Sequence, residues 1–128
     1  MKKVLLLFIL FFTIPIFAQS EITITTKKCL PKVGLYMKLN SVFDDSRCPQ
    51  GVQCIWAGEV SVSIDVYKDK KFLESKTLTF NSKNKIENFK WFEMYYSKKI
   101  KSIGVLPAPK DGVVVKPKNQ YIRIIFEE

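Results

Sequence analysis

The side chains of this sequence best suited to chemistry are its three cysteines, and the chain contains no histidine that could activate them. The lack of histidine excludes Ser/His/Asp and Cys/His catalysis and His-based zinc or copper sites. Any catalysis would have to use carboxylates, lysines, tyrosines or a thiol. The sequence has no glycine-rich phosphate loop, zincin motif, nucleophile elbow or paired-carboxylate signature. The sequence therefore weighs against an enzyme. The exception is a pair of carboxylates that are distant in the sequence and brought together only by folding, since no motif would reveal such a pair.

Two of the cysteines, Cys48 and Cys54, enclose a loop of five residues that contains Pro49 and Gly51. Two cysteines joined by such a turn predict a disulfide in an oxidising compartment. Closing so short a loop contributes about 2 kcal/mol in the chain-entropy account. The third cysteine, Cys29, is predicted to be a free thiol that is buried, exchanges with the bridge or forms an intermolecular bond. A catalytic thiol would need an electropositive site and a base, so we favour a non-catalytic Cys29.

Three acidic residues border this loop, namely Asp44, Asp45 and Glu59. They could supply oxygen ligands to a calcium ion, with loop carbonyls completing the coordination shell. No spaced D-x-D-x-D-G run is present, and Asp45 is equally suited to capping the turn or pairing with Arg47. We therefore expect turn structure and no cofactor, and keep calcium as the alternative.

Arg47 could present its planar guanidinium to a carboxylate, phosphate or sulfate group of a ligand. The structural alternative, which we favour, is that Arg47 bonds to loop carbonyls or to a neighbouring aspartate. Asp44, Asp45 and Arg47 are the candidate binding residues of the loop.

A second candidate surface is the aromatic run from Phe89 to Tyr96, which is interspersed with lysines. Trp91, Tyr95 and Tyr96 have the composition of a surface that stacks on sugars or on a nucleic-acid single strand. The rings fall on both alternating positions of the predicted strand. This favours the structural alternative, a strand packed on both faces.

The N-terminus predicts export. Two lysines precede an apolar stretch from Val4 to Phe17, and Ala18 follows it, which is the charged, apolar, small-residue order of a cleaved signal peptide. About 14 apolar residues fall short of the roughly 20 that span a bilayer. No cysteine lies where a lipoprotein needs one. We expect residues 1–18 to be removed and residues 19–128 to form one domain in the periplasm or outside the cell, without a lipid anchor or a transmembrane segment.

The predicted mature chain is basic, with 19 lysines and arginines against 12 acidic residues and a net charge of +7. Such a charge can hold a protein near anionic glycans, lipopolysaccharide or nucleic acid. The lysines are scattered along the chain, so we favour a role in solubility and expect no specific nucleic-acid partner.

Alternation of apolar and polar residues predicts an all-β fold. The cleanest pattern covers residues 55–68, in which Trp56 falls on the inward face and is expected to fill the core beside the disulfide. No stretch shows a convincing helical period. The predicted strands span residues 21–27, 33–43, 55–68, 72–80, 86–96, 98–106, 113–115 and 121–126. About seven to nine short strands separated by turns predict a single-domain antiparallel β-sandwich, with a β-barrel as the alternative.

The central stretch resembles a DSRCPxxVxCxWAG signature of small exported bacterial proteins and lipoproteins of uncharacterised function. The matching residues are Asp45, Ser46, Arg47, Cys48, Pro49, Val52, Cys54, Trp56, Ala57 and Gly58. The tail is also similar: residues 103–109, followed by residues 121–126, match the pattern of a proline-punctuated loop before a closing strand. The resemblance implies fold and location and brings no established activity. The chain departs from the simplest version of the pattern by its extra Cys29 and by lacking a lipobox.

The leading functional hypothesis is a secreted or periplasmic, non-catalytic β-sandwich that binds a partner through the disulfide loop 44–54, because binding residues concentrate on loops held by a rigid sheet. Its partner would be an envelope or extracellular protein, or an anionic glycan or polymer. One alternative is a glycan-binding or glycan-active protein that uses the aromatic run 89–96. The other is a protein that contributes only structure to the envelope.

Overall fold

A computed structural model describes residues 19–128, and the predicted signal peptide lies outside these described residues. The fold is mostly β, with one α-helix among the described residues. In chain order the elements are β1 (Glu21–Thr25), β2 (Leu35–Phe43), β3 (Val60–Lys68), β4 (Lys71–Phe80), α2 (Lys85–Tyr96), β5 (Ile100–Leu106), the 3-10 turn η1 (Pro117–Asn119) and β6 (Tyr121–Phe126).

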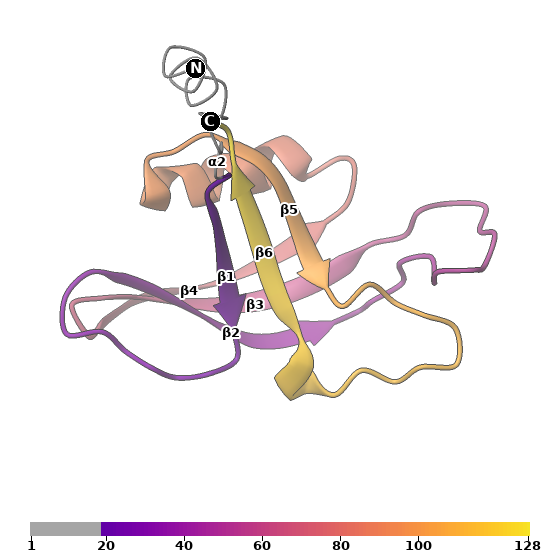
Figure 1. Ribbon diagram of the computed structural model, residues 1–128, viewed down its shortest axis with the longest axis horizontal. Coiled ribbons are helices and arrows are strands. Elements are labelled where there is room, and N and C mark those ends of the chain that lie inside the picture. Colours follow the sequence, from indigo (N-terminus) through magenta and orange to yellow (C-terminus); the bar gives the residue numbers. More distant parts are fainter. Residues whose placement is uncertain (1–18) are drawn as a thin grey trace, which may run out of the picture.

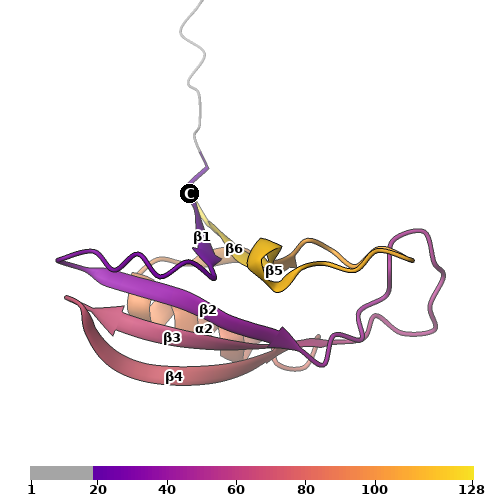
Figure 2. The ribbon, with the colours of Figure 1, turned by 90° about the horizontal axis from the view of Figure 1, so that it is seen from below.

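The six strands of residues 19–128 form two three-stranded antiparallel sheets, ordered β1-β6-β5 and β2-β3-β4. The sheets face one another as two layers, and their strands cross steeply (Figures 1 and 2). Strand β1 approaches β2 on one side, while α2 contacts both β4 and β5 on the other. The sheets do not join into a closed barrel, so the fold is sandwich-like, with fewer strands than the predicted seven to nine.

The core lies between the two layers and is built from the alternating side chains of the central strands. Val62 and Ile64 of β3, and Ile122 and Ile124 of β6, are completely buried. The strand predicted over residues 121–126 is confirmed, and its alternate residues Ile122, Ile124 and Phe126 are buried. Burying each such side chain contributes roughly 1.5–3 kcal/mol, so the facing rows of β3 and β6 hold the two sheets together.

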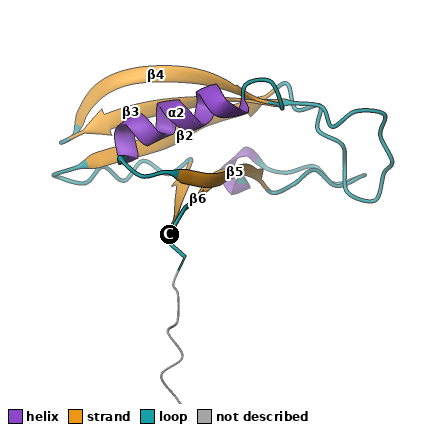
Figure 3. Cartoon of the chain, turned by 90° about the horizontal axis from the view of Figure 1, so that it is seen from above, coloured by secondary structure: helices purple, strands orange, loops and turns teal. Residues whose placement is uncertain are grey.

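The aromatic run was predicted to be a strand over residues 86–96, and this prediction is wrong, because the run forms helix α2 (Figure 3). Rings on both alternating positions are what a spacing of three and four residues produces, as in Phe89, Phe92 and Tyr96. Phe92 is fully buried, whereas Ile86 and Met94 are exposed apolar residues that blur the amphipathic pattern. The strand predicted at residues 113–115 is also wrong, because this segment belongs to an irregular connection between β5 and β6.

A chain of polar side chains fixes α2 on the sheet. Asn88 is buried on the inner side of the helix, and its Nδ2 donates to the carbonyl oxygen of Thr79 in β4 at 2.9 Å. The hydroxyl of Thr79 in turn shares a hydrogen bond of 2.9 Å with the buried Ser61 of β3. Buried polar groups that are satisfied in this way specify one position for the helix on the sheet.

We expect Asn88→Ala to lower the free energy of unfolding by about 1–3 kcal/mol, because it removes a buried hydrogen bond and leaves a small cavity. Lys90→Ala, an exposed substitution in the same helix, is the matched control and should leave stability within about 0.5 kcal/mol. Urea unfolding followed by circular dichroism measures both variants. Equal stability of Asn88→Ala and Lys90→Ala would contradict the assigned role of Asn88.

Candidate functional site

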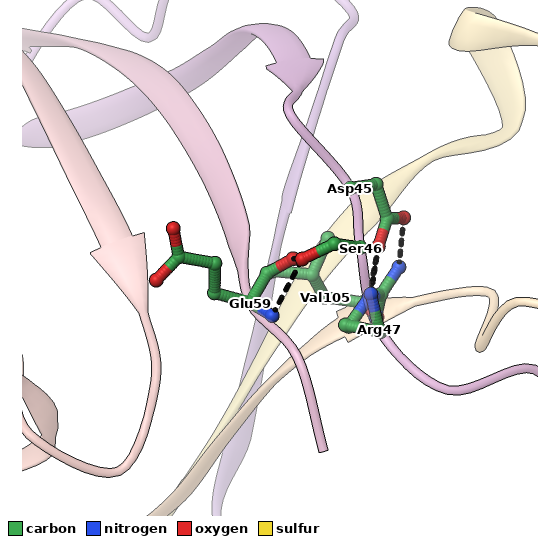
Figure 4. Close-up of polar contacts among 5 residues, drawn as sticks. All are labelled: Asp45, Ser46, Arg47, Glu59 and Val105. Atoms are coloured by element: carbon green, nitrogen blue, oxygen red, sulfur yellow. Dashed lines mark hydrogen bonds and ion pairs between the residues drawn. The ribbon is translucent and has the colours of Figure 1, made fainter. Parts of the chain in front are cut away.

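The predicted disulfide between Cys48 and Cys54 is confirmed, with a Cα–Cα distance of 5.9 Å. From here on we use "disulfide loop" for the whole connection between β2 and β3, residues 44–59, which includes the predicted binding loop 44–54. The two arms of this loop pair at its base. The amide of Ser46 donates to the carbonyl of Glu59 at 2.8 Å, and the amide of Cys48 donates to the carbonyl of Ala57 at 3.2 Å. The hydroxyl of Ser46 accepts a further bond from the amide of Glu59 at 3.1 Å (Figure 4). The loop is therefore closed twice, by its backbone arms and by the bridge.

Gly58 allows the two arms to meet. Its φ of +72° is in the left-handed region, and a Cβ built there would lie 1.9 Å from the carbonyl oxygen of Ser46. The chain therefore turns at Gly58, and β3 begins at Val60 instead of the predicted residue 55. The inward orientation predicted for Trp56 is wrong for this reason. Trp56 is 78% exposed and its neighbour Ile55 is fully exposed.

Arg47 joins the disulfide loop to the opposite sheet. Its Nε and Nη2 donate to the two carboxylate oxygens of Asp45, each at 2.8 Å, and its Nη1 donates to the carbonyl oxygen of Val105 in β5 (Figure 4). The amide of Arg47 also donates to Asp45 at 3.2 Å. These contacts are those of the favoured structural alternative, a neighbouring aspartate and a backbone carbonyl. They bring two of the predicted binding residues, Asp45 and Arg47, into one pair.

The environment of Asp45 favours its ionised form. The hydrogen bond from the Arg47 guanidinium lowers the pKa of Asp45, and this effect outweighs the opposing effect of partial burial. The third candidate of the loop, Asp44, is exposed and has a φ of 50°, which aspartate tolerates in turns. Glu59 accepts a hydrogen bond from Asn81 Nδ2 at 2.9 Å.

The acidic residues considered for calcium are thus engaged in different contacts. Within residues 19–128, no three or more His, Cys, Asp or Glu side chains are grouped so that they could hold a metal ion. In the same range, no helix has the length and apolar character needed to cross a membrane.

A second loop lies against the disulfide loop. We use "proline loop" for residues 107–120, which connect β5 to β6. The amide of Gln50 donates to the carbonyl of Pro109 at 2.8 Å, and Gln50 forms an isolated parallel bridge with Lys110. Both loops extend from the same end of the sandwich (Figures 1 and 2), which we call the loop end.

The loop end carries apolar side chains that solvent reaches. The exposed ones are Val52, Ile55 and Trp56 in the disulfide loop and Val113 and Val114 in the proline loop. Sequence analysis did not single out Ile55, Val113 or Val114 as candidate site residues. The available signal was their position, since each is an apolar residue in a segment bounded by glycine, proline or cysteine instead of in a long alternating strand.

The three aromatic candidates lie together on α2, on the side that faces the two sheets. The indole Nε1 of Trp91 donates to the Glu74 carboxylate at 3.2 Å, and the Tyr95 hydroxyl donates to the same oxygen. Tyr96 packs edge-on against Phe126, with 5.8 Å between ring centroids. The polar atoms of Trp91 and Tyr95 are thus directed into the fold.

These surroundings disfavour ionisation of two tyrosines. Burial, reinforced by the hydrogen bond to Glu74 and its negative charge, raises the pKa of Tyr95 to about 12. Burial alone raises the pKa of Tyr96 to about 12. The predicted free thiol, Cys29, is unbridged and exposed in the connection between β1 and β2, where its amide donates to the Tyr36 hydroxyl at 3.3 Å. The alternative of a buried Cys29 thiol is therefore wrong.

We expect Asp45→Asn to lower the free energy of unfolding at about pH 7 by up to ~1 kcal/mol, because the ion pair is partly exposed. The folded-state pKa of Asp45 is lowered, so its stabilisation is present above the ordinary pKa and is lost as the pH falls through the folded-state pKa. Urea unfolding at about pH 7 and about pH 2.5 measures this dependence.

The difference between wild type and Asp45→Asn should disappear in acid. Asp44→Asn is the matched control, since it removes the same charge one residue away and asparagine also tolerates a positive φ. A deficit of Asp45→Asn that is equally large at both pH values would contradict the ionic role of Asp45.

Comparisons with known proteins assign no family to this arrangement. No protein-family model matches the chain, and searches of curated proteins and of solved structures found no significant match.

Proposed function

We propose that this protein is an exported, non-catalytic binding module that holds a partner protein at its loop end. The observation that carries the proposal is the exposure of Ile55 and Trp56, which directly follow the bridge in the disulfide loop. Single exposed apolar residues are common on protein surfaces, but a cluster that contains tryptophan is typical of interaction sites.

The rigidity of the loop supports the same proposal. The Cys48–Cys54 bridge, the paired backbone arms and the Arg47 contact to β5 fix the loop before any partner arrives. Binding to a loop that is already ordered avoids the entropy cost of ordering it. Little of the binding free energy gained by burying Trp56 would therefore be lost to ordering the loop.

A hollow beside Trp56 indicates how a partner would be recognised. A cavity of about 340 Å³ lies next to the indole, and its lining includes Glu59, Asn81 and Lys83. An apolar wall with a polar rim is the usual organisation of a protein interface. We infer that the partner inserts a side chain into this hollow and packs an apolar patch on Ile55 and Trp56.

The disulfide also supports export, because such bonds persist in oxidising compartments. It agrees with the signal peptide and location predicted from the sequence. We do not extend the proposal to glycan binding by Trp91, Tyr95 and Tyr96, because their polar atoms or ring edges make contacts within the fold.

The proposal is tested by capturing partners from an envelope fraction with wild-type protein, Trp56→Ser and Leu73→Ser. Leu73 is the matched control because it is an exposed apolar residue of β4 near the hairpin at the far end of β3. We expect the captured protein to bind wild type and Leu73→Ser alike and to bind Trp56→Ser at least about tenfold more weakly, as for a hot-spot residue. Affinities are measured by surface plasmon resonance with the captured protein.

Both substitutions change exposed residues, so circular dichroism should show the same fold and thermal stability for all three proteins. Equal affinity of wild type and Trp56→Ser for every captured protein would refute a binding site at the disulfide loop.

A further inference from the structure

A groove of about 840 Å³ lies between the proline loop and the outer face of β6, and it adds positive charge to the apolar Val113 and Val114 of the loop end. Its volume is within the range of roughly 300–1,000 Å³ that is usual for ligand sites. The charged residues that line it are Lys110, Lys116, Lys118 and Arg123, and no aspartate or glutamate lines it. The charged groups that line the groove are therefore all positive, and they lie beside apolar lining residues, namely Leu106, Pro107, Ala108 and Val113, Val114 and Val115.

These four cations have no carboxylate partners. Among residues 19–128 the structure contains one ion pair, that of Asp45 with Arg47, which lies outside the groove. Cations that converge on one concave surface without counter-charges produce a positive potential that attracts anions. Elsewhere on the chain, scattered lysines are explained by solubility, but solubility does not require three lysines and an arginine around one groove.

Arg123 forms the floor of this arrangement. It lies in the central strand β6 between the buried residues Ile122 and Ile124, so its side chain is on the outer face of the sheet. Its register partners are Thr23 on β1 and Gly104 on β5, both of which are small. A Cβ built on Gly104 would meet no atom within 4 Å, so the surface beside Arg123 is open.

We propose that the groove binds an anionic polysaccharide through its repeated carboxylate or sulfate groups. Four separated cations match several negative groups along a chain, whereas a single small anion would contact only part of the groove. The amide groups of Gln50 and Asn119 and the hydroxyl of Tyr121 add neutral hydrogen-bonding partners to the lining. Such neutral partners suit the hydroxyl groups of a sugar.

Nucleic acid is the less favoured polyanion. Proteins that bind single strands stack the bases on several aromatic rings, and Tyr121 is the only aromatic residue in the lining. The groove therefore offers charge and hydrogen bonds without a stacking platform. The proposal does not rest on the proposed partner-binding role: the groove shares Val113 and Val114 with the loop end, but Ile55 and Trp56, which carry that role, do not line it.

The experiment measures binding of the purified protein to heparin and to polygalacturonate by isothermal titration calorimetry, at low and at high ionic strength. Inorganic sulfate, a single-stranded DNA oligonucleotide and neutral dextran are tested in parallel. We expect both acidic polysaccharides to bind and their affinity to fall as salt is added, because released counterions favour the complex. Sulfate alone and DNA should bind at least about tenfold more weakly per mole than the polysaccharides, and dextran should not bind.

The location is tested with Lys116→Gln/Lys118→Gln and with the same pair plus Arg123→Gln. The matched control is Lys68→Gln/Lys70→Gln/Lys71→Gln, which removes the same total charge as the triple variant at the β3–β4 hairpin. We expect at least about tenfold loss for the groove triple, a smaller loss for the exposed pair and less than about twofold loss for the hairpin triple. The pair remains informative if Arg123→Gln disturbs the sheet.

Equal losses in the groove pair and the hairpin triple would overturn the site, because binding would then follow net charge alone. Absence of polysaccharide binding at low salt, or equally tight binding of DNA or of sulfate alone, would overturn the ligand class. Trp56→Ser should bind the polysaccharides like wild type, so failure of the partner proposal and failure of this one are distinguishable.

Discussion

The contacts of Arg47 are the interaction on which the arrangement of the loops depends. The disulfide loop extends from the sheet β2-β3-β4. The guanidinium of Arg47 bonds this loop to the carbonyl oxygen of Val105, near the end of β5 in the other sheet. Asp45 holds the planar group in place with two parallel hydrogen bonds, a geometry that lysine could not reproduce. Three residues further along the same loop, the amide of Gln50 donates to Pro109, so the disulfide loop is bonded both to β5 and to the proline loop that follows it.

The other side of the sandwich is closed by different means. Helix α2 contacts β4 and β5, filling the gap that the open sheets leave there, and Asn88 fixes it to the backbone of Thr79. Trp91 and Tyr95 add hydrogen bonds to Glu74 of β4. A polar anchor within an apolar contact gives the helix one defined position, whereas apolar packing alone would tolerate sliding. The aromatic residues thus have a structural use that accounts for their number.

Local patterns in the sequence predicted the disulfide, the Asp45–Arg47 pair and most strands, because bridge spacing, turn chemistry and alternation are properties of neighbouring residues. They failed where distant contacts decide. Asn88 interrupts the apolar stripe of α2 and is buried only because Thr79 offers an acceptor. The prediction of an inward Trp56 was wrong because the chain turns at Gly58, where the two arms of the loop meet and Gly58 packs against the backbone of Ser46. The cations of the groove all lie within residues 110–123, but only the course of the proline loop over β6 places its three lysines around the same groove as Arg123.

This end of the molecule carries two surfaces of different character. The proline loop lines the cationic groove with its valines and its lysines, whereas the exposed Ile55 and Trp56 of the disulfide loop lie outside the groove. Apolar contacts are little affected by salt, whereas contacts to cations weaken as salt is added. The two surfaces therefore respond differently to the same ionic conditions, and a polyanion in the groove would leave Trp56 uncovered.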